Sequence, residues 1–382
     1  MHMTTKQDII QDQLDTYLAS TKVRKSAILK TLVNTTRMHP KAIIRRLSQL
    51  ARRRPTVRPK RRGPKVMYGP LVTVALKELW MLFHELCAER LHPQLREYVR
   101  VLRGFGSWQH NETTTRLLLR MSLGTLKTRI AILSTAADLV GRGQSTTKPS
   151  LLKELIPIRR GPWENPAPGF EEVDTVAHCG STLVGTFAYS VQTTDVATIW
   201  TGLQAQSNKG QRATVRSLNA MRKRTPFVWL GLDPDSGSEF VNWHCKGWAD
   251  SLGIQLTRTR PYRKNDHARI EQKNYTNVRD FVGYHRYDTK RQVQLLNELY
   301  RNVEDYLNFF VGSQKCIEKR RIGSKSKRIY DRARPAYQRV LDDERIDEIV
   351  KAQLRAKYAT VNPRTLKTTI DRLIEQLRRS VK

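Results

Sequence analysis

The spacing of apolar residues changes near residue 170, and this change constrains the fold more than any other feature of the sequence. Upstream, apolar residues recur at helical spacing, whereas three β-rich runs with short breaks follow at 173–178, 183–191 and 198–203. Successive runs of this kind predict neighbouring, antiparallel strands. Helical and β-rich segments then alternate, with helices near 211–224, 239–252, 269–282 and 291–310 and strands at 227–232 and 254–259. Three strands followed by alternating helices and strands predict a mixed α/β layer.

The first 50 residues predict two packed helices. An apolar face over 28–33 is interrupted at 35–39, and Pro40 suits the first position of a second helix, where its missing N–H costs nothing. The second helix is expected to leave Lys41 and Arg45 outward and to bury Ile43, Ile44, Leu47 and Leu50. A basic second helix fits a helix-turn-helix that reads the DNA major groove. An ordinary helical hairpin with a solvated basic face is the alternative.

Residues 51–65 form a strongly basic segment. Eight of these fifteen residues are Lys or Arg, none is acidic and three are proline. Such a segment cannot build a core and is expected to stay extended until it meets phosphate. An Arg-rich arm in the minor groove beside a helix in the major groove is a known arrangement, and a solvated linker is the alternative. The residues expected to contact DNA here are Arg52, Arg53, Arg54, Arg61 and Arg62.

The charge balance predicts a polyanionic partner. The chain has 69 Lys and Arg against 35 Asp and Glu, a net charge of +34. This excess repels itself unless a polyanion neutralises it. We favour nucleic acid over an anionic membrane, because the basic residues are spread through several segments that look folded. No signal peptide and no run near the ~18 apolar residues of a membrane span is found, so we expect a cytoplasmic, nucleoid-associated protein.

The remaining patterns divide the chain further. Helical spacing over 70–135, with Ser122 as a plausible N-cap, fits either a second helix-turn-helix or a simple helical core. Residues 141–168 are rich in Gly, Ser, Thr and Pro, which marks a linker. The predicted regions are a helix-turn-helix at 1–50, a basic arm at 51–69, a second helical domain at 70–140, a linker at 141–169, the α/β core at 170–312, and a basic segment with helices at 313–382.

Three acidic residues stand out in the α/β segment. Asp174 lies within the first strand, Asp235 follows the fourth strand, and Glu271 lies on a helix that opens after 264–266. Transfer of a phosphoryl group between DNA and a hydroxyl requires charge neutralisation at the entering and leaving oxygens, which two hard cations held by carboxylates supply. Any one of these acids could instead be buried on backbone or solvated. The three together predict a metal-dependent site.

Around these residues the chain resembles the integrase-core family of retroviral integrases and bacterial insertion-sequence transposases. In that family the first Asp lies on strand 1, the second follows strand 4, commonly as D-N-G-x-E-F, and the Glu lies on the next-but-one helix. The family's last interval is typically 35 residues, and 35 residues separate Asp235 from Glu271. The flanks Asp235-Ser-Gly-Ser-Glu-Phe, Arg260-Pro-Tyr-Arg-Lys-Asn and Glu271-Gln-Lys-Asn also match. The resemblance is good over about 165–340 and weak before residue 65.

This resemblance implies an RNase H-like mixed-sheet core, preceded by helical DNA-binding domains and followed by a basic, helical tail. It implies a DDE transposase or integrase that cleaves transposon ends and transfers the 3′-hydroxyl into target DNA. Asp174, Asp235 and Glu271 would hold two Mg²⁺ (or Mn²⁺) ions. Arg260, Lys264 and Lys273 would grip the transposon end. The implied partners are double-stranded DNA, as transposon ends and target, and further copies of the chain in a synaptic homo-oligomer.

The chain departs from the family pattern in two ways. Ser236 stands where the family has Asn, and Asp233 is a rival for Asp235, although only Asp235 keeps the 35-residue interval. The N-terminal part lacks the His-His-Cys-Cys zinc module of retroviral integrases, which favours a bacterial transposase. Glu239 is expected near a helix start, and Asp195 and Asp266 in structural roles. An inactive DNA-binding regulator derived from a transposase, and a structure-selective nuclease on the same fold, are the alternative functions.

Overall fold

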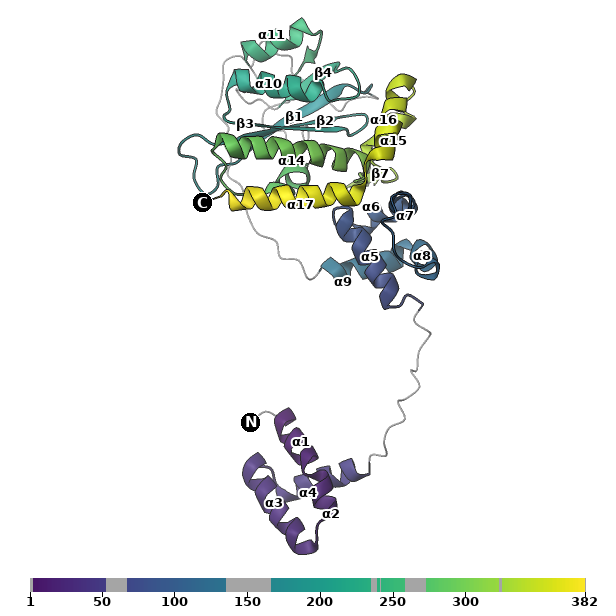
Figure 1. Cartoon of the computed structure of the whole chain (residues 1–382), viewed down its shortest axis with the longest axis vertical. Helices are drawn as coiled ribbons and strands as arrows, with labels where there is room; N and C mark the ends of the chain where they lie inside the picture. Colours follow the sequence, from purple (N-terminus) through teal and green to yellow (C-terminus); the bar gives the residue numbers. More distant parts are fainter. Residues whose placement is uncertain are drawn as a thin grey trace. The chain divides into compact units, whose positions relative to one another are not determined.

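The computed structural model describes residues 3–52, 67–134, 166–234, 239–240, 242–257, 273–322 and 325–381. The chain forms two compact units, Met1–Val66 and Met67–Lys382 (Figure 1). Each unit has a hydrophobic core of its own. Within the described residues, no helix is both long enough and apolar enough to cross a bilayer.

The first unit is a small helical bundle. Its helices are α1 (Met3–Asp12), α2 (Leu14–Ala19), α3 (Lys22–Thr36) and α4 (Pro40–Ala51). Arg37 ends α3 in the left-handed conformation with φ 53°, and Pro40 opens α4, so the predicted break between two helices is confirmed. Ile43 and Leu47 are buried as predicted, but Ile44 is 41% exposed. The use of this helix pair as a DNA reader stays a prediction.

The second unit is built on a five-stranded mixed sheet in the order β3-β2-β1-β4-β5. β1 pairs antiparallel with β2, and β2 with β3, as the sequence predicted for successive strands. β1 also pairs parallel with β4, and β4 with β5. The strands are β1 (Phe170–Ala177), β2 (Tyr189–Asp195), β3 (Thr201–Gln206), β4 (Gly231–Pro234) and β5 (Gln255–Leu256). The predicted mixed α/β layer is therefore present.

Helices cover both faces of this sheet (Figure 1). On one face, α10 (Gln211–Arg222) and α11 (Trp243–Ser251) pack over Val173, Val191 and Leu232. On the other, α14 (Lys290–Phe309) and α17 (Pro363–Arg379) share a larger core with Val176 and Leu203. Successive residues of β1 therefore face different layers, because side chains of a strand alternate between its two faces.

The helices of 70–134 belong to this second unit. They are α5 (Pro70–Leu82), α6 (Ala88–Leu91), η1 (His92–Gln94), α7 (Leu95–Gly104), α8 (Glu112–Leu119) and α9 (Leu123–Ser134). Their apolar residues continue the core of α14 and α17. Tyr306 of α14 donates a hydrogen bond to Leu82 O at 2.6 Å, and Tyr98 donates to Phe310 O at 2.6 Å. The predicted Ser122 cap is confirmed, since Thr125 N donates to its Oγ at 3.3 Å.

Two strands begin at least four residues later than the sequence predicted. The run at 183–191 becomes a strand only from Tyr189, and the run at 227–232 only from Gly231. Val184 is 80% exposed and Val228 is 74% exposed, so these apolar residues lie in loops at the surface. The strand prediction relied on β-branched and apolar residues. Such residues favour a strand, but they do not determine which of them pair with a neighbouring strand.

The segment after Gly312 differs more strongly from the prediction of a basic, helical tail. An antiparallel hairpin of β6 (Cys316–Ile322) and β7 (Lys325–Tyr330) occupies most of the basic stretch. Helices follow only as α15 (Ala336–Asp342), α16 (Glu348–Thr360) and α17, which begins at Pro363 with Asn362 as its N-cap. The tail prediction was therefore wrong for 316–330.

Part of the helix predicted at 269–282 is a π-helical turn, η3 (Asn274–Arg279), followed by α13 (Asp280–Val282).

Candidate active site

Two parallel strands bring the first candidate carboxylate to the point where β4 ends. The last paired residues of β1 and β4 are Val173 and Pro234. Pro234 has no N–H to donate, so regular pairing stops there. Asp174 is the next residue of β1, and the chain therefore leaves β4 beside it. Asp235, the next residue after Pro234, lies outside the described residues.

Asp174 is half-buried, and each carboxylate oxygen accepts a hydrogen bond. Thr175 N donates to Oδ1 at 2.7 Å, and Asn274 Nδ2 donates to Oδ2 at 2.5 Å. Asn274 opens η3 and stands three residues after Glu271, which lies outside the described residues. The segment that follows the predicted catalytic glutamate thus rests against the predicted catalytic aspartate, although 100 residues separate Asp174 from Asn274.

The oxygen atoms around Asp174 suit a hard cation. Asn274 Oδ1 is buried and has no hydrogen-bond partner among the described residues. Side-chain amide oxygens and carboxylates are the ligands that Mg²⁺ and similar ions take in proteins. Within the described part of the chain, no group of three or more His, Cys, Asp or Glu side chains could hold a metal. The described donors therefore fit a divalent cation but form only part of the predicted ligand set.

Glu239 connects the loop after β4 to β1. Its side chain is 1% exposed, and Oε1 accepts hydrogen bonds from Thr175 Oγ1 at 3.0 Å and from Lys209 Nζ at 3.0 Å. The sequence predicted Glu239 at a helix start, but α11 begins at Trp243 with Asn242 as its N-cap. That prediction was wrong, because Glu239 turns inward to an ion pair. Glu239 thereby ties the loop after Asp235 to the residue that follows Asp174.

Asp233, the rival for Asp235, has a structural partner. It is fully buried, and Thr257 Oγ1, directly after β5, donates to its Oδ1 at 2.7 Å. Asp195 is likewise buried, and its carboxylate caps a turn by accepting from Thr198 N, Thr198 Oγ1 and Gly169 N. Both carboxylates thus tie neighbouring backbone segments together, as the sequence predicted for Asp195.

Lys273, one residue before Asn274, lies among charged groups of the second unit. Burial, together with the positive charges of Arg90 and Arg339, lowers the pKa of its ammonium to about 7, against the raising effect of Glu172. Burial also raises the pKa of Glu171 well above its usual range. The sequence predicted that Lys273 contacts DNA. In this structure it is half-buried, and its contact with DNA stays a prediction.

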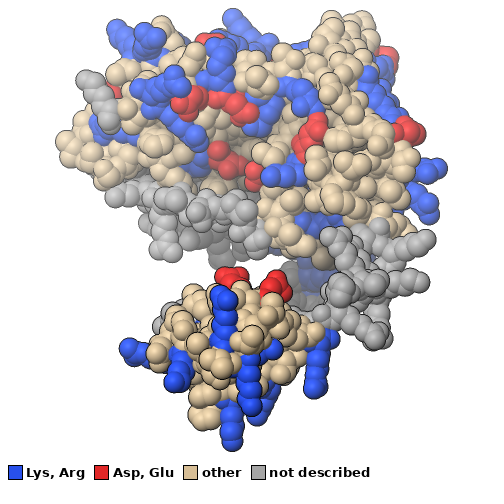
Figure 2. All heavy atoms as spheres, turned by 60° about the horizontal axis from the view of Figure 1, so that its bottom comes forward, with Lys and Arg blue, Asp and Glu red and all other residues tan. Residues whose placement is uncertain are grey.

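The other predicted DNA-binding residues fall in two groups. Lys41, Arg45 and Arg52 are exposed on α4 and at its C-terminal end. Figure 2 shows Lys and Arg side chains projecting over much of the visible face of the first unit. Outside the described residues lie Arg53, Arg54, Arg61, Arg62, Arg260 and Lys264.

α8 and α9, the predicted second helix-turn-helix, use their basic residues partly within the unit. Arg129 donates to Thr73 Oγ1 and to Tyr68 O, both at 2.7 Å, and Lys127 pairs with Glu89 at 2.8 Å. These contacts join α9 to α5 and α6. They favour the helical-core interpretation of 70–135 over that of a DNA reader.

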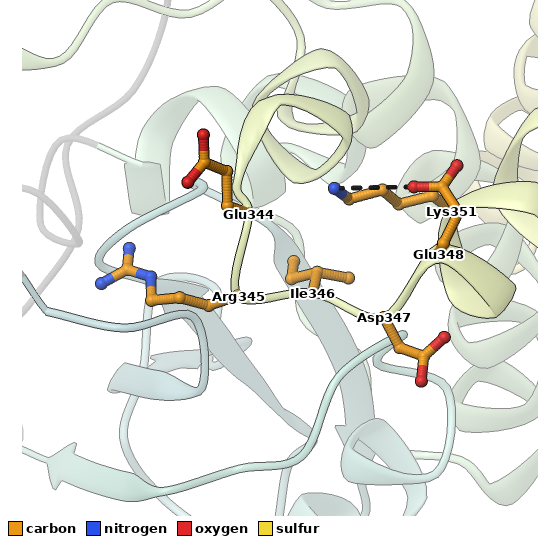
Figure 3. A pocket seen from close by; sticks show the side chains of 6 residues that line it. All are labelled: Glu344, Arg345, Ile346, Asp347, Glu348 and Lys351. Carbon is orange, nitrogen blue, oxygen red and sulfur yellow. Dashed lines mark ion pairs between the residues drawn. The ribbon is translucent and has the colours of Figure 1, made fainter.

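A charged hollow of about 580 Å³ lies at the turn into α16 (Figure 3). Two of its lining carboxylates, Asp347 and Glu348, have partners within the protein. Asp347 caps α16 by accepting from Ile349 N at 2.7 Å, and Glu348 pairs with Arg355 at 2.5 Å and with Lys351 at 3.9 Å. These two side chains cap and stabilise the start of α16. The hollow is therefore a weaker candidate site than the surroundings of Asp174.

The contacts of Asn274 and Glu239 were not predicted from the sequence. The family flank Glu271-Gln-Lys-Asn did mark position 274, and α-helical spacing predicts that Asn274, Tyr275 and Val278 lie near one side of a helix. Tyr275 is instead 42% exposed while Val278 is fully buried, because a π-helical turn does not keep α-helical spacing. Only the distant partners Asp174 and Lys209 reveal what these side chains do.

The chain is similar to a curated protein over most of its length and to solved integrase cores only distantly. No family model matches the sequence. The catalytic core domain of BIV integrase aligns with a TM-score of 0.29 and 13% identity, covering 38% of this chain and 86% of that one. The uncharacterized protein y4rM of Sinorhizobium fredii is 33% identical over 324 residues, which cover 85% of this chain and 91% of y4rM. The chain therefore belongs to the same protein family as y4rM of Sinorhizobium fredii.

Proposed function

We propose that this protein is a DDE-type DNA transposase that cleaves the ends of a mobile DNA element and joins them to target DNA. The observation that carries the proposal is the hydrogen bond between Asp174 and Asn274. It joins the strand of the first predicted catalytic acid to the segment that follows the third. The parallel β1–β4 pair supports the second acid, because β4 ends at Pro234, which pairs with Val173, the residue before Asp174.

Asp174, Asp235 and Glu271 would hold Mg²⁺ or Mn²⁺, two ions in each site. When bound, such ions neutralise negative charge on the phosphate that is being transferred and lower the pKa of an attacking water. In cleavage, a water oxygen bonds to phosphorus and the 3′-oxygen leaves with a proton, which gives a 3′-hydroxyl and a 5′-phosphate. In joining, that hydroxyl attacks a target phosphodiester, and one P–O bond forms as another breaks. The joining step therefore needs no external energy source.

DNA recognition is proposed to lie chiefly in the first unit. The exposed Lys41, Arg45 and Arg52 on and after α4, together with Arg53, Arg54, Arg61 and Arg62, would contact the element end. Arg260, Lys264 and Lys273 would hold the end near the carboxylates. Since each element has two ends, we propose that copies of the chain assemble on them before cleavage.

The test uses the full chain with duplexes made from the DNA that flanks its gene, including any inverted repeats. Asp174→Asn is compared with Asp250→Asn, a matched control whose carboxylate forms a surface pair with Lys246. Even changes to groups around metal ligands cost about 10–100-fold. We therefore expect Asp174→Asn to lose at least 100-fold in Mg²⁺-dependent cleavage, and both variants to bind DNA within a few-fold of wild type.

Three outcomes would contradict the proposal. Cleavage by Asp174→Asn within a few-fold of wild type would remove Asp174 from the site. Specific binding by the wild type without Mg²⁺- or Mn²⁺-dependent cleavage would favour the DNA-binding regulator. Cleavage without joining of matched ends to a plasmid would favour the structure-selective nuclease.

A further inference from the structure

The basic hairpin of β6 and β7 forms a two-stranded sheet separate from the five-stranded one. Between Cys316 and Tyr330 the sequence holds six Lys or Arg and one acid, Glu318. A two-stranded ribbon has no hydrophobic face large enough to stabilise it alone. Its position must therefore be fixed by its base or by a partner.

The base of the ribbon is firmly held. Ser313 and Arg334 exchange backbone hydrogen bonds of 3.0 and 3.1 Å. Asp331 accepts from Lys315 N at 2.7 Å and pairs with Arg339 at 2.5 Å. The Arg339 side chain is only 4% exposed and also donates to Ser313 O at 2.9 Å. These contacts fix both strands where they leave the body of the unit.

The exposed part of the ribbon carries its positive charge. Arg320 and Lys327 occupy directly opposite positions in the register, with Arg321 and Arg328 next to them, and all four are exposed. Like charges directly opposite each other in a sheet disfavour the pairing. Glu318 offsets part of this through its pair with Arg320 at 2.5 Å. The remaining excess favours an anionic partner.

The base of the ribbon also lies near the amino end of β1. Lys315 Nζ donates to Ala197 O at 3.2 Å, just after Asp195, and Asp195 lies opposite Glu171 of β1. Asp174 is three positions after Glu171, which is about 10 Å along β1. The ribbon is thus anchored within one turn of a DNA duplex from the proposed catalytic carboxylate.

We propose that the β6–β7 ribbon is a DNA-binding element that enters a groove of double-stranded DNA and contacts its phosphates through Arg320, Arg321, Lys327 and Arg328. The inference rests on the proposed function, because DNA is the substrate there. The major groove admits a two-stranded ribbon, and several DNA-binding proteins use strands in this way. Double-stranded DNA is favoured over a membrane because the exposed ribbon is charged on both strands.

The test is a salt titration of binding to a 30-base-pair duplex of arbitrary sequence, with the full chain. The ribbon variant changes Arg320, Arg321, Lys327 and Arg328 to Gln. The control variant changes Lys290, Arg291, Arg301 and Arg372, four exposed residues of α14 and α17, to Gln, and so removes the same charge. Each phosphate contact contributes about −0.9 to the slope of log K against log salt. We expect the ribbon variant to lose about 2–4 units of slope and at least 10-fold in affinity, and the control less than one unit.

A third variant exchanges Lys and Arg at the four ribbon positions and keeps their charge. It is expected to bind within a few-fold of wild type, which separates lost charge from a misfolded ribbon.

Equal losses in the ribbon and control variants would overturn the inference, as would tighter binding to anionic vesicles or single-stranded RNA than to duplex DNA. If wild type cleaves DNA in an Asp174-dependent way while the ribbon variant binds normally, only the ribbon inference fails. If wild type does not cleave but the ribbon variant loses binding, only the proposed chemistry fails.

Discussion

At the residue scale, acids close together in space differ in what their side chains contact. Asp233 bonds to Thr257, Glu239 bonds to Thr175 and Lys209, and the amide of Asn274 reaches Asp174. The first two contacts connect elements of the protein. The third places a side-chain amide at a half-buried carboxylate, and both groups carry oxygens of the kind that divalent cations take. These contacts, more than the number of acids, separate structural from catalytic candidates.

The Glu239–Lys209 pair should stabilise the loop after β4. Glu239→Gln keeps an acceptor for Thr175 but loses the charge opposite Lys209, so we expect a loss of about 1–3 kcal/mol in the free energy of unfolding. Lys209→Met is expected to cost a comparable amount, because it leaves a buried carboxylate with one donor fewer. The double variant should cost less than both together, by about 0.5–3 kcal/mol. Urea unfolding followed by tryptophan fluorescence measures this, and strict additivity would contradict the pair.

His178 should make the second unit less stable in mild acid. Burial lowers the pKa of its imidazole to about 3, and Nε2 bonds to Ser190 Oγ at 2.7 Å. Below its unfolded pKa of about 6.5, only the unfolded chain gains the proton, so stability falls as pH falls from about 6.5 towards 3. Between pH 7 and pH 5 this amounts to about 2 kcal/mol, from a slope of about 1.4 kcal/mol per pH unit.

The comparison variant is His178→Gln, whose amide can reach Ser190 but does not titrate. Its unfolding free energy should fall less than that of wild type between pH 7 and pH 5. All seven tryptophans lie within 67–382, so their fluorescence follows the second unit alone. Parallel pH profiles for the two proteins would show that His178 does not titrate on unfolding.

The contacts of the candidate site that the sequence could not predict are those between residues far apart in the sequence. The strand position of Asp174 was predicted from its β-rich neighbours, although Asn274, which donates to its carboxylate, lies 100 residues away. The structural role predicted for Asp195 is also found, with its partner Thr198 three residues away. Glu239 was misplaced because its partner Thr175 lies 64 residues away, and nothing in its own neighbourhood signals that contact. Predictions for Asp235 and Glu271 rest on the spacing of the family motif and stay predictions.

At the element scale, the sequence predicted elements well where one side is buried. α14 was expected at 291–310 and is found at Lys290–Phe309, because its apolar residues recur on one face. The β6–β7 hairpin was missed for the opposite reason. Its strands carry charges on successive residues, so their apolar residues follow neither the helical nor the strand spacing. Only Gly323-Ser324 between them indicated a turn.

The capping box of α14 should contribute measurably to stability. Thr289 Oγ1 accepts from Gln292 N at 3.2 Å, and Gln292 Oε1 accepts from Thr289 N at 3.0 Å. Thr289→Ala removes one of these bonds, and loss of an N-cap costs about 1 kcal/mol. Thr368→Ala on the exposed surface of α17 is the matched control, and alanine there should be neutral or slightly stabilising. Equal unfolding free energies for the two variants would show that the cap contributes nothing.

At the scale of the whole molecule, the chain consists of two units with separate cores. The sequence placed borders at 50, 69, 140, 169 and 312, and the one at 69 lies close to the border between the units after Val66. However, α5–α9 and the final helices share the core of α14. Helical periodicity identifies an apolar face but not the element that covers it, so packing partners across 200 residues could not be predicted. The border between the two units is therefore a place where the chain can be divided experimentally.

A fragment of residues 67–382 should fold and keep the proposed chemistry but lose recognition of the element's ends. It keeps both faces of the sheet and the surroundings of Asp174, and it lacks α4 and the basic arm that follows. Because each lost phosphate contact removes about 0.9 from the slope of log K against log salt, a loss of about 4–6 contacts should make binding clearly less dependent on salt. Binding is measured with duplexes of the flanking DNA and with scrambled duplexes, and an unchanged tryptophan melting midpoint confirms folding. An unchanged salt slope, together with an unchanged preference for the flanking duplex, would place end recognition in the second unit.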